Sequence, residues 1–410
     1  MHEAERAQKP RSWLLWFRPL CGCLCGVSSS PAEWLLNRVA DVWHWDARLC
    51  AGLRRLTRLL WWSVWGAAVG YLGCLLLLLL LFRMIGERWG LLWPFLYLPP
   101  QFSLLPMAVL APVGLLLCPL SLLVDAATVA LILFAYMGFS LPLPGCATSG
   151  PTVVVMTCNM GQRNNARLTS FVEAEAPDVI VLQDAANHGG AYARQYSDRC
   201  VQALGEYVVI SRFPIRSVAW VDDLHWQGQL VAARFELDWD GTALIVYAVH
   251  LPTPRRELGR LMGLGLLKEW IRSHGWFGSD ARLAVTASLT SRVPLARALQ
   301  QRVAAEDDPA IVAGDLNSPH CGYIYRTMAS GLHDAYAERG WGCGFTFPGT
   351  TRNPLTFFGP WLRLDYILCG KGLRPCMAKV ESASRAQHRA VVARLRRVDI
   401  GLNKPGKAGR

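Results

Sequence analysis

An uncharged apolar run of 24 residues, Leu59–Phe82, constrains the fold of this 410-residue chain more than any other feature. At a rise of about 1.5 Å per residue, a helix of that length can cross the roughly 30 Å hydrocarbon core of a bilayer. A buried helix of a soluble protein rarely needs such a run, and a cleaved signal peptide would begin earlier and be shorter. We therefore expect the chain to span a membrane.

Two further uncharged stretches, 89–124 and 126–162, are separated by Asp125 alone. Prolines interrupt the first of them, so its helices must be short, kinked or re-entrant. We expect a transmembrane region at 59–145 with about three spans, near 59–82, 92–117 and 120–141. Two spans, or one span with a re-entrant hairpin, are the alternatives.

Basic residues ahead of the first span predict its orientation. The arginines at positions 38, 48, 54, 55 and 58 precede it and favour a cytoplasmic N-terminus. With three spans, the part of the chain after residue 150 then lies outside the cytoplasm; with two, it lies inside. We expect a multi-pass protein of the cell membrane whose C-terminal domain is extracytoplasmic.

The two ends of the chain are basic. Apolar residues recur near helical spacing in 33–60, with charged residues between them, and this predicts a basic amphipathic helix on the membrane surface, within a cytoplasmic or interfacial region at 1–58. A soluble helix packed on another domain is the alternative. The last segment, 397–410, is expected to be a basic disordered tail.

From Thr152 the pattern changes to short β runs separated by helices and turns. A helix is expected at 164–176, and Asp238–Gly241 has the composition of a hairpin turn. A further helical segment is expected at 256–272. The β runs are 152–157, 179–183, 207–210, 230–237, 243–249, 310–313, 364–368 and 390–395. So many strands with interspersed helices predict two packed sheets covered by helices, in a domain at 150–396.

Polar residues gather where these runs end. A single carboxylate at the end of a strand is usually a cap or a turn residue, but seven side chains of the kinds used in hydrolysis indicate a site. They are Asn159, Asp184, His250, Asp315, Asn317, Asp365 and His388.

In chain order these residues belong to the motifs Asn, Leu-Gln-acid, Ser-Arg-x-Pro, x-His-Leu, Gly-Asp-x-Asn, Arg-x-Asp-Tyr and x-x-His. This ordered set resembles the endonuclease/exonuclease/phosphatase superfamily, which includes deoxyribonuclease-I-like nucleases and several phosphatases. Asp334-Ala and Gly-Phe-Thr-Phe-Pro at 344–348 are similar to its bacterial members. The resemblance covers about 152–395 and implies a four-layer α/β sandwich.

The resemblance also implies roles for the residues. Asp184 would be the principal ligand of Mg²⁺ or Mn²⁺, and Asn159 would add its amide oxygen. His388 would be the general base for water, oriented by Asp365. Asp315 would lie near the nucleophile or the leaving oxygen, and His250 and Asn317 would bind phosphoryl oxygens.

Two residues depart from the family pattern. The family usually has Glu where this chain has Asp184, which is one methylene shorter. It typically has Asp where this chain has Gln387, which carries no charge. We therefore expect a weaker metal site than in other members.

These features together predict a membrane-anchored, Mg²⁺-dependent phosphoesterase that cleaves phosphodiester or phosphomonoester bonds by attack of activated water. The lipid bilayer is one expected partner and a phosphate ester is the substrate, either a lipid head group or a nucleic acid. The alternative is a catalytically weakened relative that binds a phosphorylated ligand or partner at the membrane.

Overall fold

The computed structural model describes residues 31–43, 47–142, 150–161, 168–254, 291–349, 359–382 and 386–398. The helix expected at 256–272 and all but the first two residues of the expected tail lie outside these ranges. The described chain forms two compact units. Helices up to Leu78 and between Gln101 and Leu133 make the first, and Leu79–Pro100 joins the residues from Phe134 onward in the second.

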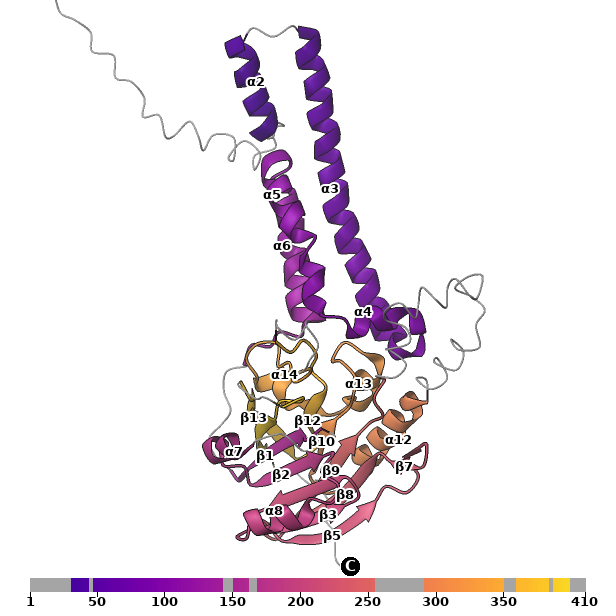
Figure 1. The fold of residues 1–410 in the computed structure, drawn as a ribbon. Helices are drawn as coiled ribbons and strands as arrows, with labels where there is room; N and C mark the ends of the chain where they lie inside the picture. The colour runs from indigo at the N-terminus through magenta and orange to yellow at the C-terminus, as the bar shows by residue number, and fades with distance from the viewer. Residues whose placement is uncertain are drawn as a thin grey trace, which may run out of the picture. The chain divides into compact units, whose positions relative to one another are not determined.

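The first unit is helical (Figure 1). Its longest helix, α3, has 38 residues and continues from the basic segment into the apolar run without a break. The prediction of a single amphipathic helix at 33–60 is therefore wrong, because the residues from Ala47 onward belong to α3. No Pro or Gly–Pro break separates the two segments, so the helix propagates. The elements are α2 (Pro31–Trp43), α3 (Ala47–Met84), α5 (Met107–Leu117), α6 (Ser121–Leu131) and the π-helical turn η4 (Ile132–Tyr136), which crosses into the second unit.

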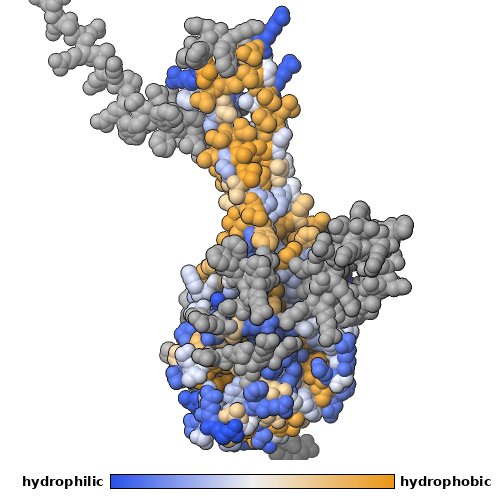
Figure 2. Space-filling model, viewed as in Figure 1, coloured by the Kyte–Doolittle hydropathy of each residue, from blue (hydrophilic) through white to orange (hydrophobic). Residues whose placement is uncertain are grey.

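Two helical segments are long and apolar enough to cross a membrane, as judged by length and composition: Arg48–Met84 and Pro100–Leu117. The apolar helix Ser121–Tyr136 is shorter than these. Figure 2 shows hydrophobic side chains along the surface of these helices. Among them Leu59, Trp62 and Val109 are each more than 60% exposed.

The span expected at 92–117 is wrong at its N-terminal end. Pro94 lies in the first turn of the short helix α4 (Trp93–Tyr97), and Leu98 is extended ahead of Pro99. A residue before proline disfavours the helical conformation, so α4 stops there. Trp93 and Leu96 are buried, and α4 belongs to the second unit. The 3₁₀ turns beside it are η1 (Gly86–Arg88), η2 (Gly90–Leu92) and η3 (Pro100–Leu104).

The second unit contains two six-stranded mixed sheets (Figure 1). The first has the order β13-β14-β1-β2-β4-β3 and the second the order β11-β12-β10-β9-β8-β5. Strands of the first sheet are β1 (Thr152–Asn159), β2 (Val179–Gln183), β3 (Cys200–Leu204), β4 (Tyr207–Ser211), β13 (Leu373–Val380) and β14 (Val391–Arg397). Those of the second are β5 (Ile215–Trp220), β8 (Ala232–Trp239), β9 (Thr242–His250), β10 (Ala310–Asp315), β11 (His333–Asp334) and β12 (Asp365–Cys369), and β6 (His225–Trp226) pairs with β7 (Gln229–Leu230).

The inner faces of the two sheets form one apolar core, which includes Val155 and Val181 from the first sheet and Phe235 and Val246 from the second. Separate apolar clusters lie on the outer faces of the sheets. One lies beneath α7 (Thr169–Glu175), and the other lies beneath α12 (Arg292–Ala305) and α13 (Tyr323–Met328). The helices of this unit are α7 (Thr169–Glu175), α8 (Gly189–Gln195), α12 (Arg292–Ala305), α13 (Tyr323–Met328) and α14 (Ala335–Arg339). Two packed sheets flanked by helices confirm the expected sandwich.

The strands that are buried along their whole length are the ones that the sequence predicts best. The run expected at 179–183 is β2, and the hairpin expected around Asp238–Gly241 joins β8 to β9. The helix expected at 164–176 is described as α7, which is shorter. The sequence misses β3, β5 and β13, whose residues are largely or alternately exposed, so they carry no continuous apolar run.

Candidate active site

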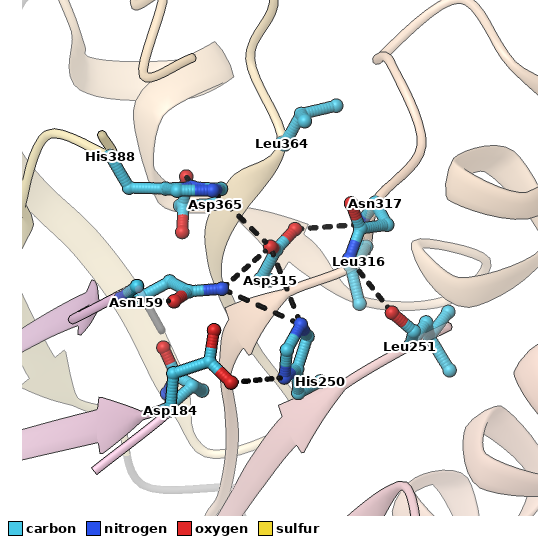
Figure 3. Close-up of polar contacts among 12 residues, drawn as sticks. Asn159, Asp184, His250, Leu251, Asp315, Leu316, Asn317, Leu364, Asp365 and His388 are labelled. Atoms are coloured by element: carbon cyan, nitrogen blue, oxygen red, sulfur yellow. Dashed lines mark hydrogen bonds and ion pairs between the residues drawn. The ribbon is translucent and has the colours of Figure 1, made fainter. Parts of the chain in front are cut away.

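The ends of several central strands converge on one cavity of about 470 Å³. Parallel pairing brings Asn159 beside Gln183 in one sheet and Asp315 beside His250 in the other. Antiparallel pairing adds Asp365 directly opposite Asp315. Figure 3 shows the side chains of Asn159, His250 and Asp315 pointing toward one another from both sheets. The structure therefore brings together all seven residues that the sequence singles out.

A buried histidine lies between two buried aspartates. His388 donates from Nδ1 to Oδ2 of Asp365 over 2.9 Å, and its Nε2 lies 3.8 Å from Oδ2 of Asp315. Burial by itself lowers the pKa of His388, but the negative charges of Asp365 and Asp315 outweigh it and raise that pKa. The hydrogen bond at Nδ1 leaves Nε2 as the nitrogen that can accept a proton.

Asp315 is held from two sides. Its Oδ1 accepts from the backbone N–H of Asn317 at 2.8 Å, and its Oδ2 accepts from Nδ2 of Asn159 at 3.0 Å. The other end of the Asn159 amide, Oδ1, accepts from the N–H of Gly161 at 2.9 Å. These contacts fix the orientation of the amide, because only its NH₂ group can face a carboxylate. The amide oxygen keeps one lone pair for a further ligand.

His250 joins Asp315 to a second acidic group. Its Nδ1 donates to Oε1 of Glu206 at 3.0 Å and lies 3.9 Å from Oδ1 of Asp184. Burial lowers the pKa of His250, while the hydrogen bond to Glu206 and the charges of three carboxylates raise it, to about 9. His250 is therefore a cation near neutral pH and suits an anionic ligand.

Backbone conformation at the strand ends is unusual. Asp184 and Asn317 both have positive φ, 53° and 47°, a region that Asp and Asn tolerate better than most residues. Gly314, at φ 151°, has no alternative, because a Cβ there would lie 1.9 Å from the carbonyl oxygen of Val249. The glycine of the Gly-Asp-x-Asn motif thus allows β10 to approach β9 closely.

The loop after Asp315 is braced by buried groups from distant segments. Arg292 of α12 donates to the carbonyl oxygens of Leu316 and Asn317 at 3.2 and 2.6 Å. The hydroxyl of Tyr97 donates to the same carbonyl of Asn317 at 3.0 Å. The side chain of Asn317 donates to the carbonyl of Leu251 at 2.8 Å, which ties the loop to the end of β9.

A fully buried carboxylate, Glu87 of η1, supports the next residues. One of its oxygens accepts from the hydroxyl of Ser318 at 2.5 Å. The other accepts from the backbone N–H groups of Tyr323 and Ile324 at 2.7 and 3.2 Å. Glu87 therefore caps the start of α13 and fixes the loop that follows Asn317.

Arg363 of the Arg-x-Asp-Tyr motif has a structural role. It is buried and forms an ion pair with Asp334 at 3.0 Å, among the rings of Tyr325, Tyr336 and Tyr366. Asp334 also accepts from the N–H groups of Tyr336 and Ala337 at the start of α14. This network anchors the chain immediately before Asp365.

Sequence reasoning misses four residues of the site: Glu206, Glu87, Tyr97 and Arg292. Glu206 lies in a two-residue turn without a motif, and Glu87 reads as one charge of a nearly balanced loop. Tyr97 falls inside the expected span at 92–117. Gln387, in contrast, lines the cavity as expected from its place beside His388.

Comparison with known proteins agrees with this geometry. A sequence model of the Endonuclease/Exonuclease/phosphatase family matches residues 156–386, more than half of the chain. The chain therefore belongs to the endonuclease/exonuclease/phosphatase family. No match is found among curated proteins.

Solved structures also resemble part of this chain. One from Bacteroides vulgatus is 15% identical, covers 60% of this chain and 100% of its own, and has a TM-score of 0.44. A humanized TDP2 of D. rerio is 14% identical, covers 60% and 98%, and has a TM-score of 0.43. A mannosyl-6-phosphatase of Bacteroides thetaiotaomicron is 15% identical, covers 59% and 99%, and has a TM-score of 0.41.

Proposed function

We propose that this protein is a membrane-anchored, metal-dependent phosphoesterase that hydrolyses a phosphodiester or phosphomonoester by attack of activated water. One observation carries the proposal. A buried His388 held by Asp365 and a cationic His250 lie on either side of Asp315 in a single open cavity. In this proposal His388 is the base and His250 is the anion-binding group, and both act on one phosphate.

The donor atoms fit a hard divalent cation. Among the residues that the structure describes, the carboxylates of Asp184 and Glu206 have oxygen atoms within 4.8 Å of one another, and so do those of Asp315 and Asp365. Oδ1 of Asp365 is buried and accepts no hydrogen bond from any residue in the described ranges. Carboxylate and amide oxygens are what Mg²⁺ or Mn²⁺ prefers, and Asp184 and Asn159 would hold the ion. When bound, it would neutralise charge on the phosphate.

His388 acts as the general base in this proposal. Its Nε2 takes a proton from the attacking water, and the imidazolium that forms is stabilised by Asp365 and Asp315. Asp365 also holds the ring in the tautomer that leaves Nε2 unprotonated. Asp315, 3.8 Å from Nε2, orients the water or the leaving oxygen.

His250 and Asn317 bind the phosphoryl oxygens. The positive charge of His250 opposes the negative charge that builds up as water attacks. Asn317 uses one amide hydrogen on the carbonyl of Leu251 and keeps the other for the ligand. Both residues line the cavity.

The helical unit would anchor the enzyme in the cell membrane as a multi-pass protein. By length and composition, the segments Arg48–Met84 and Pro100–Leu117 support two membrane passes, and we propose the shorter apolar helix Ser121–Tyr136 as a third. Together with the arginines before residue 59, three passes favour an extracytoplasmic sandwich. Cys376 on β13 is disulfide-bonded, which also favours an oxidising compartment. Protease accessibility of the sandwich in intact cells tests this orientation.

The substrate class follows from location and chemistry: a phosphate ester near a membrane, either a lipid head group or a nucleic acid. The test is release of phosphate or alcohol from a panel of phospholipids, sugar phosphates and oligonucleotides, with Mg²⁺, Mn²⁺ or chelator. We expect turnover of at least one class that requires the metal and is lost in His388→Ala. Turnover that persists in chelator would contradict the metal-dependent reaction.

Gln387 favours a second candidate function. Without a carboxylate beside His388, the site has one negative charge fewer than the family pattern. A catalytically weak relative could then bind a phosphorylated ligand or partner at the membrane. Ligand binding by the wild type and by His388→Ala, without turnover across the panel, would support this candidate over the first.

A further inference from the structure

Glu206 reaches the cavity from an element that carries no family motif. It follows Gly205, which has φ 60°, in the tight turn between β3 and β4. Its own carbonyl oxygen accepts from the backbone N–H of Ala185 at 2.9 Å. Because Ala185 directly follows Asp184, this hydrogen bond holds the two carboxylate-bearing segments side by side.

The side chain of Glu206 is placed for a ligand. Its carboxylate lines the cavity, and its ligand atom lies within 4.8 Å of those of Asp184 and His250. His250 engages Oε1, which leaves Oε2 outside that hydrogen bond. The side chain is 32% exposed, so water and ions can reach it.

A carboxylate at position 206 changes the charge of the site. Two residues depart from the family pattern. Gln387 lacks the charge of the Asp that the family typically has there. Asp184 is one methylene shorter than the Glu that the family usually has. Glu206 adds a carboxylate to the cavity that Asp184 and Gln387 also line.

We propose that Glu206 is a carboxylate ligand of the metal site and replaces the carboxylate that is absent at Gln387. The inference rests on the proposed function, since it concerns the same metal. The competing role for Glu206 is to orient His250 through the hydrogen bond to Nδ1. The two roles differ in what they require, because a ligand needs the charge and an orienting residue needs only an acceptor oxygen.

Glu206→Gln separates the two roles, because the amide oxygen still accepts from His250 while the charge is lost. The probe is Mn²⁺ alone, titrated into the full-length chain in detergent micelles and followed by calorimetry and by the electron paramagnetic resonance signal of free Mn²⁺. We expect Glu206→Gln to weaken Mn²⁺ binding about 10-fold or more. Asp198→Asn, an exposed acid outside the cavity, is the matched control and should leave affinity unchanged.

A second substitution tests the replacement itself. Gln387→Asp in the Glu206→Gln background should recover most of the lost affinity, because it restores a carboxylate to the cavity. Wild-type affinity in Glu206→Gln, with its fold intact by circular dichroism, would overturn the inference and leave Glu206 as a residue that orients His250. Failure of the double variant to recover any affinity would also contradict the replacement. A wild type that binds no Mn²⁺ would instead contradict the proposed function.

Discussion

Asp365 Oδ2 lies 2.9 Å from His388 Nδ1, and both side chains are almost completely buried. A buried carboxylate this close to imidazole serves two purposes. It fixes which ring nitrogen carries the hydrogen, and it stabilises the cationic ring once a proton has been taken. Substitution of His388 should therefore lower turnover, and substitution of Asp365 should also change the pH dependence of activity.

Removal of the base should abolish most turnover. We expect His388→Ala to lower kcat by about 10²- to 10⁴-fold, the usual contribution of general base catalysis. Metal affinity should change little, because His388 is not among the proposed ligands. Steady-state kinetics and Mn²⁺ titration measure the two quantities. His333→Ala is the control, since His333 pairs with Glu338 and does not line the cavity.

The pH dependence should report the same histidine. A base must be unprotonated, and the pKa of His388 is raised by Asp365 and Asp315 against the effect of burial. Activity should therefore fall with decreasing pH from a midpoint above the ordinary value of about 6.5. Asp365→Asn keeps the hydrogen bond but removes the charge, so the midpoint should move to lower pH. An unmoved midpoint in the pH profile of kcat/KM would be inconsistent with this assignment.

The hydrogen bonds of Glu87 join the 3₁₀ turn that follows α3 to the loop after Asn317. Glu87→Ala leaves the Ser318 hydroxyl and two backbone N–H groups of a buried region without their acceptor, and should destabilise the sandwich by about 2–4 kcal/mol. In a thermal melt this corresponds to a decrease in Tm of roughly 4–16 °C. Glu87→Gln, which retains one acceptor oxygen, should lose less. Equal melting temperatures for all three proteins would show that this buried contact contributes nothing.

Asp184, a proposed metal ligand, has a backbone with positive φ. Its φ of 53° suits Asn as well as Asp, so Asp184→Asn should keep the fold while it removes the charge. We expect Mn²⁺ affinity to fall about 10-fold or more with Tm unchanged. Asp184→Glu restores the family residue in an unfavourable conformation, so its Tm should decrease. A lower Tm in Asp184→Asn than in Asp184→Glu would refute the conformational argument.

Much of the sandwich could be predicted from the sequence because its central strands are buried on both faces. Val179–Gln183 and Ala310–Asp315 carry uninterrupted apolar runs that end in polar residues, and such runs fix both the strand and its functional end. Edge strands such as β3 and β13 lack this signal, because exposed positions accept almost any residue.

The parts that escaped prediction depend on contacts between distant segments. Nothing local marks Glu206 as a neighbour of His250, since the pair is joined only by the packing of the two sheets. Tyr97 and Trp93 were assigned to a span because they are apolar or aromatic, which cannot distinguish a lipid environment from a protein core. The prolines near them were the informative signal, and they mark the end of α4.

The decisive measurement is hydrolysis of a panel of phosphate esters by the purified protein, with Mg²⁺ and with chelator. We expect the wild type to release product from at least one membrane-proximal ester only when the metal is present. We also expect His388→Ala to lose that release under the same conditions. Equal release by the wild type and His388→Ala, or release that does not depend on the metal, would contradict the proposed function.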